Sequence, residues 1–285
     1  MLTLTSPQVV QETVLRWKRE CKVGFVPTMG CLHEGHLRLI LKARQFAPKV
    51  IVSIFVNPLQ FGPNEDFTRY PRPFEEDRAK LDELNVDLLF VPSIEELYPN
   101  GFDTKVHVGK LGETMEGQFR PGHFDGVATV CLKLFQIAQP DFVVFGEKDF
   151  QQLRIIQQMA ADFNLPTTVV SHPTVRDGDR LAISSRNRYL SNDERLMALK
   201  LPQALNKAQT LVSNSGATVK GVLNTVREIL SGLSIDYVTV ASTQDLNPCD
   251  ETTRVEDVVD PRIFAAIRVG STRLIDNLPL TAEEK

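Results

Sequence analysis

The sequence predicts an α/β protein in which a doubly wound parallel sheet is followed by a smaller α+β domain. In the first two-thirds of the chain, short apolar runs alternate with amphipathic stretches. Two of the runs, VIVSIFV at 50–56 and DFVVFG at 141–146, are nearly continuous and rich in β-branched residues, which is typical of strands covered on both faces. From about residue 176 the sequence becomes polar and turn-rich, and helical patterns then precede strand-like runs. We therefore expect a Rossmann-like domain at 1–176 and a smaller lid domain at 177–285.

The individual elements follow from periodicity and composition. The strand-like runs of the first domain are 22–27, 50–56, 86–92, 141–146 and 167–173. The helical patterns between them are 36–46, 74–84, 126–138 and 149–163. Strand–helix alternation of this kind favours a parallel sheet. The smaller domain has helical patterns near 193–213 and 218–232 and strand-like runs at 235–242, 263–270 and 272–280.

The composition excludes several classes of protein. The 285 residues are 42% hydrophobic and 24% charged, with a net charge of −4 and mixed signs, which argues against a general nucleic-acid or acidic-membrane surface. No apolar stretch approaches the roughly 20 residues of a membrane span. The four cysteines show neither a C-x-x-C pair nor zinc-like spacing, so we expect free thiols in a reducing cytosol. The N-terminus lacks a signal-peptide pattern, and we expect a cytoplasmic protein.

Polar side chains gather where the predicted strands end. The four segments concerned are 28–36, 57–66, 147–149 and 174–179. In open α/β sheets ligands bind beyond the carboxyl ends of the strands, near the point where the strand order reverses. These four loops are therefore expected to converge on one cleft.

The stretch PTMGCLHEGH at 27–36 is the most informative of these loops. His33 and His36 lie three residues apart on a helix predicted to begin near Leu32 or His33, so both imidazoles can point at one phosphate group. A helix N-terminus favours an anion, and Gly35 would let a base or ribose approach the backbone. In the main alternative, one histidine caps the helix and the other packs in the core. A metal site is disfavoured because the spacing differs from that of a zinc helix.

Two other loops carry groups suited to substrates. Asn57 and Gln60 follow the second strand, where neutral amides suit recognition of a small polar substrate, although Asn57 before proline is also ordinary turn chemistry. Lys148 could follow phosphates as charge moves, Asp149 could accept a bond from a ribose hydroxyl, and Gln152 would face back into the cleft. The alternative for these charged residues is a solvated turn with a helix cap.

The remaining polar stretches also have two interpretations. ISSRNR at 183–188 combines two hydroxyls with two guanidinium groups, as in a phosphate-gripping lid, or it is a solvated linker between domains. Arg120 and His123 precede a helix and either contact an anion or mark the start of that helix. Cys31 is the one candidate for a cysteine nucleophile, and a free thiol is the favoured interpretation.

Taken together, six stretches resemble the pantothenate synthetase (pantoate–β-alanine ligase) family of the nucleotidyltransferase superfamily, in order over nearly the whole chain. They are PTMGCLHEGH, VSIFVNPLQFGPNEDFTRYPR, RPGHFDGVATV, GEKDFQQL, LAISSRNRYL and the closing TRLIDN. The resemblance implies that pantoate attacks the α-phosphate of ATP to give pantoyl adenylate and pyrophosphate, and that β-alanine then displaces AMP. It also implies Mg²⁺ arriving with ATP, small-molecule substrates and no nucleic-acid or membrane partner, and a homodimer.

The resemblance assigns roles to particular residues. His36 matches the family's proton donor, and we expect His36, His33 and Lys148 to act as donors that stabilise charge, with His36 mainly a hydrogen-bond donor. Gln60 matches the contact to both pantoate and β-alanine, Gln152 matches a second pantoate contact, and Asn57 is expected beside them. No residue is assigned to the metal. The positions that match ATP contacts are Met29, Gly30, Cys31, Leu32, His33, Glu34, Gly35, His36, Gly146, Glu147, Lys148, Asp149, Val175, Ile183, Ser184, Ser185 and Arg186.

Two other functions remain as alternatives. A plain nucleotidyltransferase would use the same histidines but stop after transferring AMP to a small acceptor. A nucleotide-sensing protein with a dead site would bind ATP without turnover, although the full set of donors argues against it.

Overall fold

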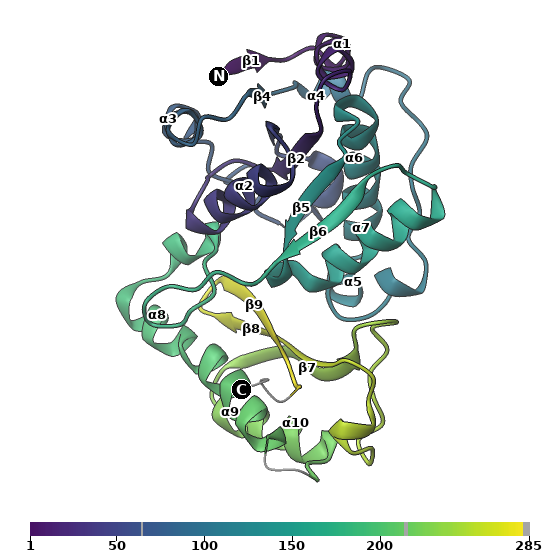
Figure 1. Ribbon diagram of the computed structural model, residues 1–285. Coiled ribbons are helices and arrows are strands. Elements are labelled where there is room, and N and C mark those ends of the chain that lie inside the picture. Colours follow the sequence, from purple (N-terminus) through teal and green to yellow (C-terminus); the bar gives the residue numbers. More distant parts are fainter. Residues whose placement is uncertain (64, 214–215, 282–285) are drawn as a thin grey trace. The chain divides into compact units, whose positions relative to one another are not determined.

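The computed structural model describes residues 1–63, 65–213 and 216–281, which form two compact units (Figure 1). The first unit comprises Met1–Glu147 and Ile155–Pro173. The second comprises Lys148–Arg154 together with the chain from Thr174 onwards. The domain boundary predicted between residues 176 and 177 stays a prediction.

The first unit is built on a parallel sheet of six strands. Their order is β1-β4-β3-β2-β5-β6, and every pairing is parallel, so the predicted doubly wound sheet is confirmed. The strands are β1 (Leu2–Leu4), β2 (Val23–Thr28), β3 (Lys49–Ile54), β4 (Leu88–Phe90), β5 (Phe142–Gly146) and β6 (Thr168–His172). β1 was not predicted because three residues are too short to show a period.

The strand order reverses between β2 and β5. From β2 the chain proceeds outward through β3 to β4, and it then returns to the other side of β2 to form β5 and β6. The β2–β5 ladder contains only two pairs, Gly24–Phe142 and Phe25–Val143. The backbone carbonyl of Val23 points toward β5, and the direction of the backbone N–H and C=O groups alternates along a strand. The backbone groups of Pro27 therefore also point toward β5, but proline has no N–H to donate. The two strands therefore stop pairing before their carboxyl ends, which leaves that edge of the sheet open for a site.

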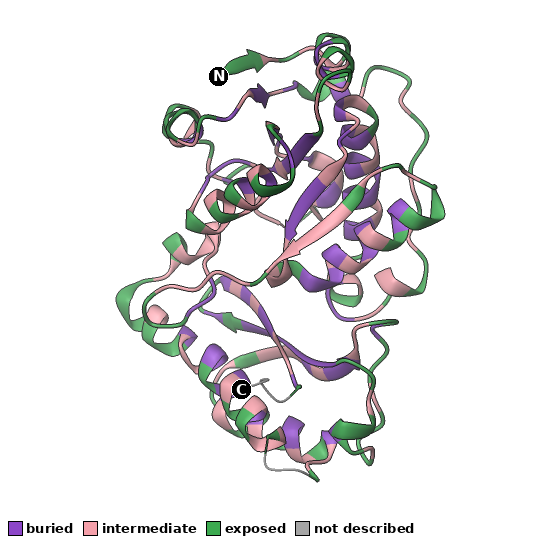
Figure 2. Cartoon of the chain, in the orientation of Figure 1, coloured by how far each residue is buried: buried purple, intermediate pink, exposed green. Residues whose placement is uncertain are grey.

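Helices cover both faces of this sheet, and its buried residues lie mainly in strands β2 to β5 and in α6 (Figure 2). On one face Ile40 of α2 belongs to a cluster with Val26 and Val144 of the strands. On the other face Phe135 of α6 packs edge-on against Phe25. The helices are α1 (Pro7–Trp17), α2 (Glu34–Phe46), α3 (Phe74–Glu83), α4 (Ile94–Leu97), α5 (Glu116–Phe119), α6 (His123–Ala138) and α7 (Phe150–Asp162).

The second unit is an antiparallel sheet with helices packed against it, as predicted for a smaller α+β domain. Its strands pair in the order β7 (Ser234–Ser242), β8 (Pro261–Val269) and β9 (Thr272–Pro279). The helix predicted near 193–213 is two helices, α8 (Asn192–Ala198) and α9 (Lys200–Val212), and α10 (Val219–Ile229) follows. The break has a physical cause, because Pro202 has no N–H to donate to the carbonyl of Ala198.

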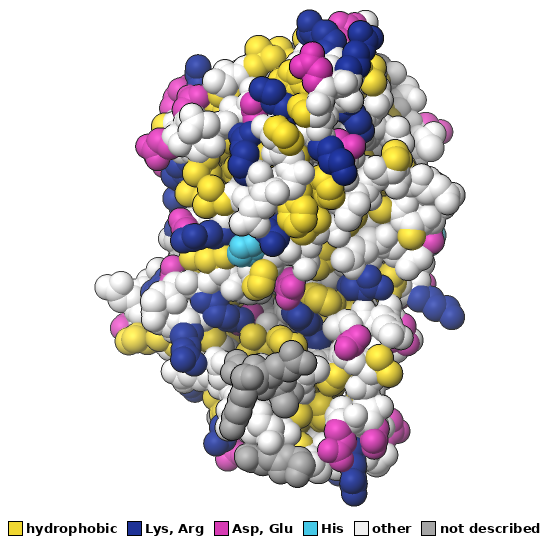
Figure 3. All heavy atoms as spheres, in the orientation of Figure 1, with side chains coloured by type: hydrophobic (Ala, Val, Ile, Leu, Met, Phe, Trp, Pro, Cys, Tyr) yellow, Lys and Arg dark blue, Asp and Glu magenta, His cyan; other side chains and the backbone are white. Residues whose placement is uncertain are grey.

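Short 3₁₀ turns connect several of these elements. They are η1 (Pro58–Gln60), η2 (Lys110–Gly112), η3 (Glu147–Asp149), η4 (Ser185–Tyr189) and η5 (Val255–Asp257). Basic and acidic side chains are interspersed on the face shown in Figure 3, in keeping with the mixed charge of the sequence. Among the described residues, no helix has the length and apolar character needed to cross a membrane.

Asp87 connects several residues at the amino-terminal ends of the strands, and its contacts lead to a prediction about stability. Its carboxylate accepts hydrogen bonds from Arg44 (2.7 Å), Lys49 (2.8 Å) and the backbone N–H of Val50 (2.9 Å). Burial alone would raise the pKa of Asp87, but these partners hold it below its ordinary value of 3.8. A depressed pKa means that the ionised form stabilises the fold above that value and that this stability is lost as the pH falls.

We expect Asp87→Asn to lower the free energy of unfolding at pH 7 by about 1–3 kcal/mol, because the amide cannot replace the charged bonds. The deficit relative to wild type should shrink at pH 3, because below pH 3.8 the unfolded wild-type chain binds a proton at Asp87 and the ionised form stabilises the fold less. Urea unfolding at both pH values measures this, with Asp103→Asn on an exposed loop as control. An equal deficit at both pH values would contradict the ionic role.

Candidate active site

The loop after β2 turns sharply before α2 begins. The hydroxyl of Thr28 donates to the Ser53 carbonyl at 2.7 Å and accepts the N–H of Gly30 at 3.1 Å. Gly30 (φ 78°) and Cys31 (φ 51°) then take two successive left-handed conformations. For a residue with a Cβ this conformation carries strain, so Cys31 must be held in place by its surroundings.

The residue that holds it is Asp77 of α3. Its carboxylate is buried, at 1% exposure, and accepts the N–H groups of Cys31 (2.6 Å) and Leu32 (2.7 Å). Burial raises the pKa of Asp77, while the two N–H bonds and Lys80 act in the opposite direction. Lys80 also donates to the Leu32 carbonyl at 2.8 Å, so α3 fixes this loop at three atoms.

These bonds correct one expectation for the loop. The sequence predicts a helix start near Leu32 or His33 whose N–H groups favour an anion, but the N–H groups of residues 30–33 each donate within the protein. The anion that the N–H groups of Cys31 and Leu32 bind is the protein's own Asp77. A role for Cys31 or Leu32 in ATP binding stays a prediction, and it cannot depend on their N–H groups.

His33 and His36 lie side by side at the start of α2. The helix begins at Glu34, slightly later than predicted, with His33 as its N-cap. The two rings stack with centroids 4.0 Å apart and planes inclined by 23°. The His33 backbone N–H donates to Nδ1 of His36 at 3.3 Å, so the neutral His36 ring carries its proton on Nε2. The position of His33 at the N-cap agrees with the alternative in which one histidine caps the helix. Both rings are half-buried, so neither histidine is a core residue.

Gly35 has a role in the packing of the two histidines that the sequence did not suggest. A Cβ at Gly35 would lie 3.0 Å from Cε1 and Nδ1 of the His33 ring. The missing side chain therefore makes room for His33 itself, whereas the sequence suggested room for a base or ribose. The neighbouring Glu34 is exposed and forms an ion pair with Arg38 at 2.6 Å.

The loop after β3 brings Gln60 to the same edge of the sheet. Gln60 is 9% exposed, and its Nε2 lies 3.1 Å from the Met29 sulfur. Asn57 donates to Oε1 of Gln60 at 3.0 Å and to the Gly126 carbonyl at 3.1 Å, and it accepts from Tyr98 at 2.8 Å. The Asn57 amide is thus engaged in holding the turn, which favours the structural interpretation for it. Its predicted contact with pantoate stays a prediction.

Helix α6 packs directly on this turn. A Cβ at Gly126 would lie 2.1 Å from the Leu59 carbonyl oxygen and 2.7 Å from the Gln60 nitrogen, so only glycine allows the contact. His123, in the first turn of α6, donates from Nδ1 to the Gln60 carbonyl at 2.8 Å. Both contacts fix the backbone from which the Gln60 side chain projects.

Arg120 and Glu65 complete a network behind Gln60. Arg120 binds both carboxylate oxygens of Glu65 at 2.7 Å and donates from Nη1 to Nε2 of His123 at 2.9 Å. Burial first, and then the charge of Arg120, lower the pKa of His123 to about 4. Although burial acts to raise it, Arg120 holds the pKa of Glu65 below its ordinary value. His123 is therefore neutral at pH 7. Arg120 binds Glu65 and His123 next to the start of α6, which favours the helix-start interpretation of these two residues over contact with an external anion.

The end of β5 lies beside the histidine helix. A Cβ at Gly146 would be 3.9 Å from Cδ2 of Leu39, which α2 carries one turn after His36. Glu147 is half-buried and begins the turn η3. The next residue, Lys148, is the first of the second unit, and its Nζ lies 3.7 Å from Oδ1 of Asp149. Gln152 follows in the first turn of α7.

The remaining predicted residues lie on one loop of the second unit. The Ile183 N–H donates to the Val175 carbonyl at 3.0 Å, so two segments predicted to contact ATP are paired. The hydroxyl of Ser184 accepts the N–H of Arg186 at 3.3 Å and caps η4, which begins at Ser185.

Several positions that organise the site were not recognised in the sequence. Asp77 lies in a helix with many acidic residues, and nothing in that helix marks the one whose partners are on another loop. Glu65 lies in the polar segment 57–66, where nothing distinguished it from its neighbours, and Tyr98 lies in a stretch without a pattern. Among the described residues, no group of three or more His, Cys, Asp or Glu side chains is placed to hold a metal ion.

Comparisons with known proteins agree with this architecture. A family model described as pantoate-beta-alanine ligase matches residues 2–279. The pantothenate synthetase of Sulfurihydrogenibium sp. is 47% identical over 98% of this chain and 99% of its own length. That of Aquifex aeolicus is 48% identical over 90% of each chain.

Solved structures show the same relationship. A pantothenate synthetase from Thermus thermophilus superposes with a TM-score of 0.91 at 46% identity, covering 98% of this chain and 99% of that one. A pantoate-beta-alanine ligase from Francisella tularensis, complexed with beta-gamma ATP and beta-alanine, superposes at 0.81 with 35% identity and 98% coverage of both chains. The predicted ligase function is thus confirmed over the plain nucleotidyltransferase, and the chain belongs to the pantoate–β-alanine ligase family.

Proposed function

We propose that this chain joins pantoate to β-alanine in two steps driven by ATP. A carboxylate oxygen of pantoate attacks the α-phosphorus, and the bond to the departing pyrophosphate breaks. The β-alanine nitrogen then attacks the acyl carbon of pantoyl adenylate, AMP leaves, and the nitrogen loses a proton. The observation that carries this proposal is the stacked pair His33–His36 at the open edge of the sheet, in a chain that matches the ligase family from residue 2 to residue 279.

The histidines suit the first step because it needs alignment and charge stabilisation but no covalent intermediate. His36 has Nδ1 committed to a backbone N–H, so its neutral ring donates from Nε2. We propose that this N–H and His33 bind phosphate oxygens on which charge develops. Pyrophosphate is a good leaving group with Mg²⁺, so a donor suffices and a strong acid is unnecessary.

ATP is proposed to contact four further groups of residues. Lys148 supplies a compact positive charge for the phosphates, beside Asp149, Gly146 and Glu147. Met29–Gly35 precede and begin α2, and Val175 lies beside Ile183 on the paired loop. The turn that follows, with Ser184, Ser185 and Arg186, offers hydroxyl and guanidinium donors of the kind that bind phosphate. The support for these assignments is the match of each segment to the family's motifs.

Gln60 is proposed to contact both pantoate and β-alanine, with Asn57 and Gln152 as further pantoate contacts. Support comes from the way the turn is held, because Asn57, Gly126 and His123 each restrain Gln60. A neutral amide held in this way can select hydroxyl and carboxylate oxygens by direction.

Three coarser inferences accompany the reaction. We infer that Mg²⁺ arrives bound to ATP, since this ion typically keeps several waters and takes much of its coordination from phosphates. A homodimer and a cytoplasmic location are inferred from the family. Sedimentation of the purified chain tests the dimer.

The reaction itself predicts the products. With ATP, pantoate and β-alanine, mass spectrometry should detect pantothenate and AMP in equal amounts, and pyrophosphate–ATP exchange should require pantoate. Formation of ADP, or exchange supported equally by unrelated carboxylates, would overturn the proposal.

Substitutions of His36 separate a hydrogen-bond donor from an acid. His36→Ala should lower the rate of pantoyl-adenylate formation by about 10²–10³. His36→Gln should retain activity within about tenfold of wild type, because its amide can accept the His33 N–H and still donate. Rapid-quench measurement of the adenylate gives both rates, and His107→Ala, exposed on the same unit, is the matched control. Equal losses for the Ala and Gln variants would favour an acid.

The neutral state of His123 predicts a pH dependence of stability. Its pKa falls from 6.5 to about 4 on folding, so the unfolded chain binds the extra proton between these values and stability falls as the pH is lowered through them. The loss should be on the order of 3 kcal/mol. His123→Gln should flatten this dependence in urea unfolding between pH 7 and 4, whereas His107→Gln should not. An unchanged slope in His123→Gln would contradict a neutral His123.

A further inference from the structure

The segment Lys148–Arg154 is attached to the second unit at three points. At its start the Lys148 carbonyl accepts a hydrogen bond from Asn277 of β9. Next, the Phe150 ring lies 4.0 Å from the guanidinium carbon of Arg262. At its end Arg154 donates to the Thr243 carbonyl at 2.8 Å. The position of Lys148 therefore depends on the small antiparallel sheet, although only Glu147 separates Lys148 from the end of β5 in the chain.

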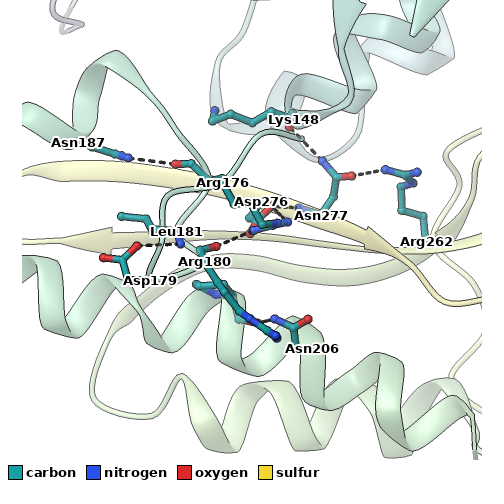
Figure 4. A network of polar contacts seen from close by, with 12 residues as sticks. Lys148, Arg176, Asp179, Arg180, Leu181, Asn187, Asn206, Arg262, Asp276 and Asn277 are labelled. Carbon is teal, nitrogen blue, oxygen red and sulfur yellow. Dashed lines mark hydrogen bonds and ion pairs between the residues drawn. The ribbon is translucent and has the colours of Figure 1, made fainter. Parts of the chain in front are cut away.

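Asn277 is the residue that contacts Lys148 itself. It is 3% exposed, its Nδ2 donates to the Lys148 carbonyl at 3.0 Å, and its Oδ1 accepts from Nη1 of Arg262 at 2.5 Å. Arg262 is also buried, at 8% exposure. Figure 4 shows the chain of contacts from Arg262 through Asn277 to the Lys148 backbone, with the Lys148 side chain extending away from Asn277.

This contact needs a side chain that both accepts and donates, as the amide of Asn277 does. The side chain must accept from a guanidinium on one side and donate to a carbonyl on the other, which a carboxylate or an apolar group cannot do. If Asn277 were lost, the Lys148 carbonyl would lose this donor, and the backbone there would be expected to move toward another one.

The preceding residue of β9 holds a second segment in the same way. Asp276, 3% exposed, binds Arg176 through both oxygens at 2.7 and 2.9 Å. Arg176 directly follows Val175 and bridges to Ala182, which precedes Ile183. Two neighbouring side chains in the closing TRLIDN stretch thus reach both segments of the second unit that are expected to contact ATP (Figure 4).

We propose that Asn277, oriented by Arg262, is a positioning residue for Lys148. By fixing the Lys148 carbonyl it sets the point from which the lysine side chain reaches the phosphates. This inference rests on the role proposed above for Lys148. The TRLIDN stretch contributes to the family resemblance, but the resemblance assigned no role to its residues. The proposal gives this stretch a role in the adenylation step.

A double-mutant cycle on the full-length chain tests the proposal. Asn277→Asp keeps the size of the side chain and the acceptor for Arg262 but removes the donor to Lys148. We expect it to lower kcat for pantoyl-adenylate formation about 10- to 100-fold, because a displacement on the order of 1 Å at a reacting group has a cost of this size. The KM for pantoate should stay near wild type. In the Lys148→Ala background the same substitution should change kcat less than about twofold, since its effect is transmitted through Lys148.

The control is Asn206→Asp, which removes the same kind of amide-to-carbonyl bond elsewhere in the second unit. Asn206 donates to the Pro202 carbonyl at 2.7 Å within α9. We expect this variant to lose a comparable amount of thermal stability and to keep wild-type kcat. If Asn277→Asp does not fold, Arg262→Met supplies the cycle, because it keeps an apolar contact with Phe150 but no longer orients Asn277.

The outcomes are distinct. Equal fold losses from Asn277→Asp in both backgrounds, or a wild-type rate for Asn277→Asp, overturn the positioning role and leave the proposed function intact. A wild-type rate for Lys148→Ala overturns the proposed role of the lysine and this inference with it. Loss in the wild-type background alone supports the inference.

Discussion

The carboxylate of Asp77, buried and bound to two successive backbone N–H groups, is the interaction on which the histidine site depends. The loop it binds contains two left-handed residues in a row, and for Cys31 that conformation costs on the order of 1–3 kcal/mol. Hydrogen bonds to a charged group contribute about 1.5–3 kcal/mol each, so the two bonds that Asp77 accepts are strong enough to hold the strained loop. Because α2 starts immediately after this loop, the same bonds set where both imidazoles lie.

The open edge of the sheet arises from a missing donor in β2. Pro27 has no N–H to donate to β5, and the two central strands stop pairing after Phe25. Central strands of a parallel sheet otherwise satisfy their backbone groups along their whole length. The proline therefore acts at the point where the strand order reverses, and the polar loops that follow β2 and β5 are free to turn toward a ligand. The proline that interrupts the pairing of the sheet therefore also leaves space for a site.

How much the sequence predicted depended on how local each signal is. The strands of the large sheet and the pairing of His33 with His36 follow from spacing within a few residues, and the structure has both. Asp77 and Asn277 could not be identified, because each acts on backbone atoms more than forty residues away in the chain. The attachment of Lys148–Arg154 to the second unit was missed for the same reason, since a periodic helical pattern says nothing about which sheet holds its first turn.

The placement of the acidic residues explains how a chain of net charge −4 can accommodate a polyanion. Three carboxylates near the predicted substrate residues, two of them buried and that of Glu65 half-buried, have partners within the protein. Asp77 is bound by backbone N–H groups, Glu65 by Arg120 and Asp276 by Arg176. A carboxylate whose oxygens are occupied by N–H donors presents little unbalanced negative charge to a neighbouring phosphate. The same bonds also position Gln60 and the segment after Val175. Repulsion of ATP is thus reduced because these acids serve as structural anchors, and the imidazoles and Lys148 remain as the groups proposed to bind the phosphates.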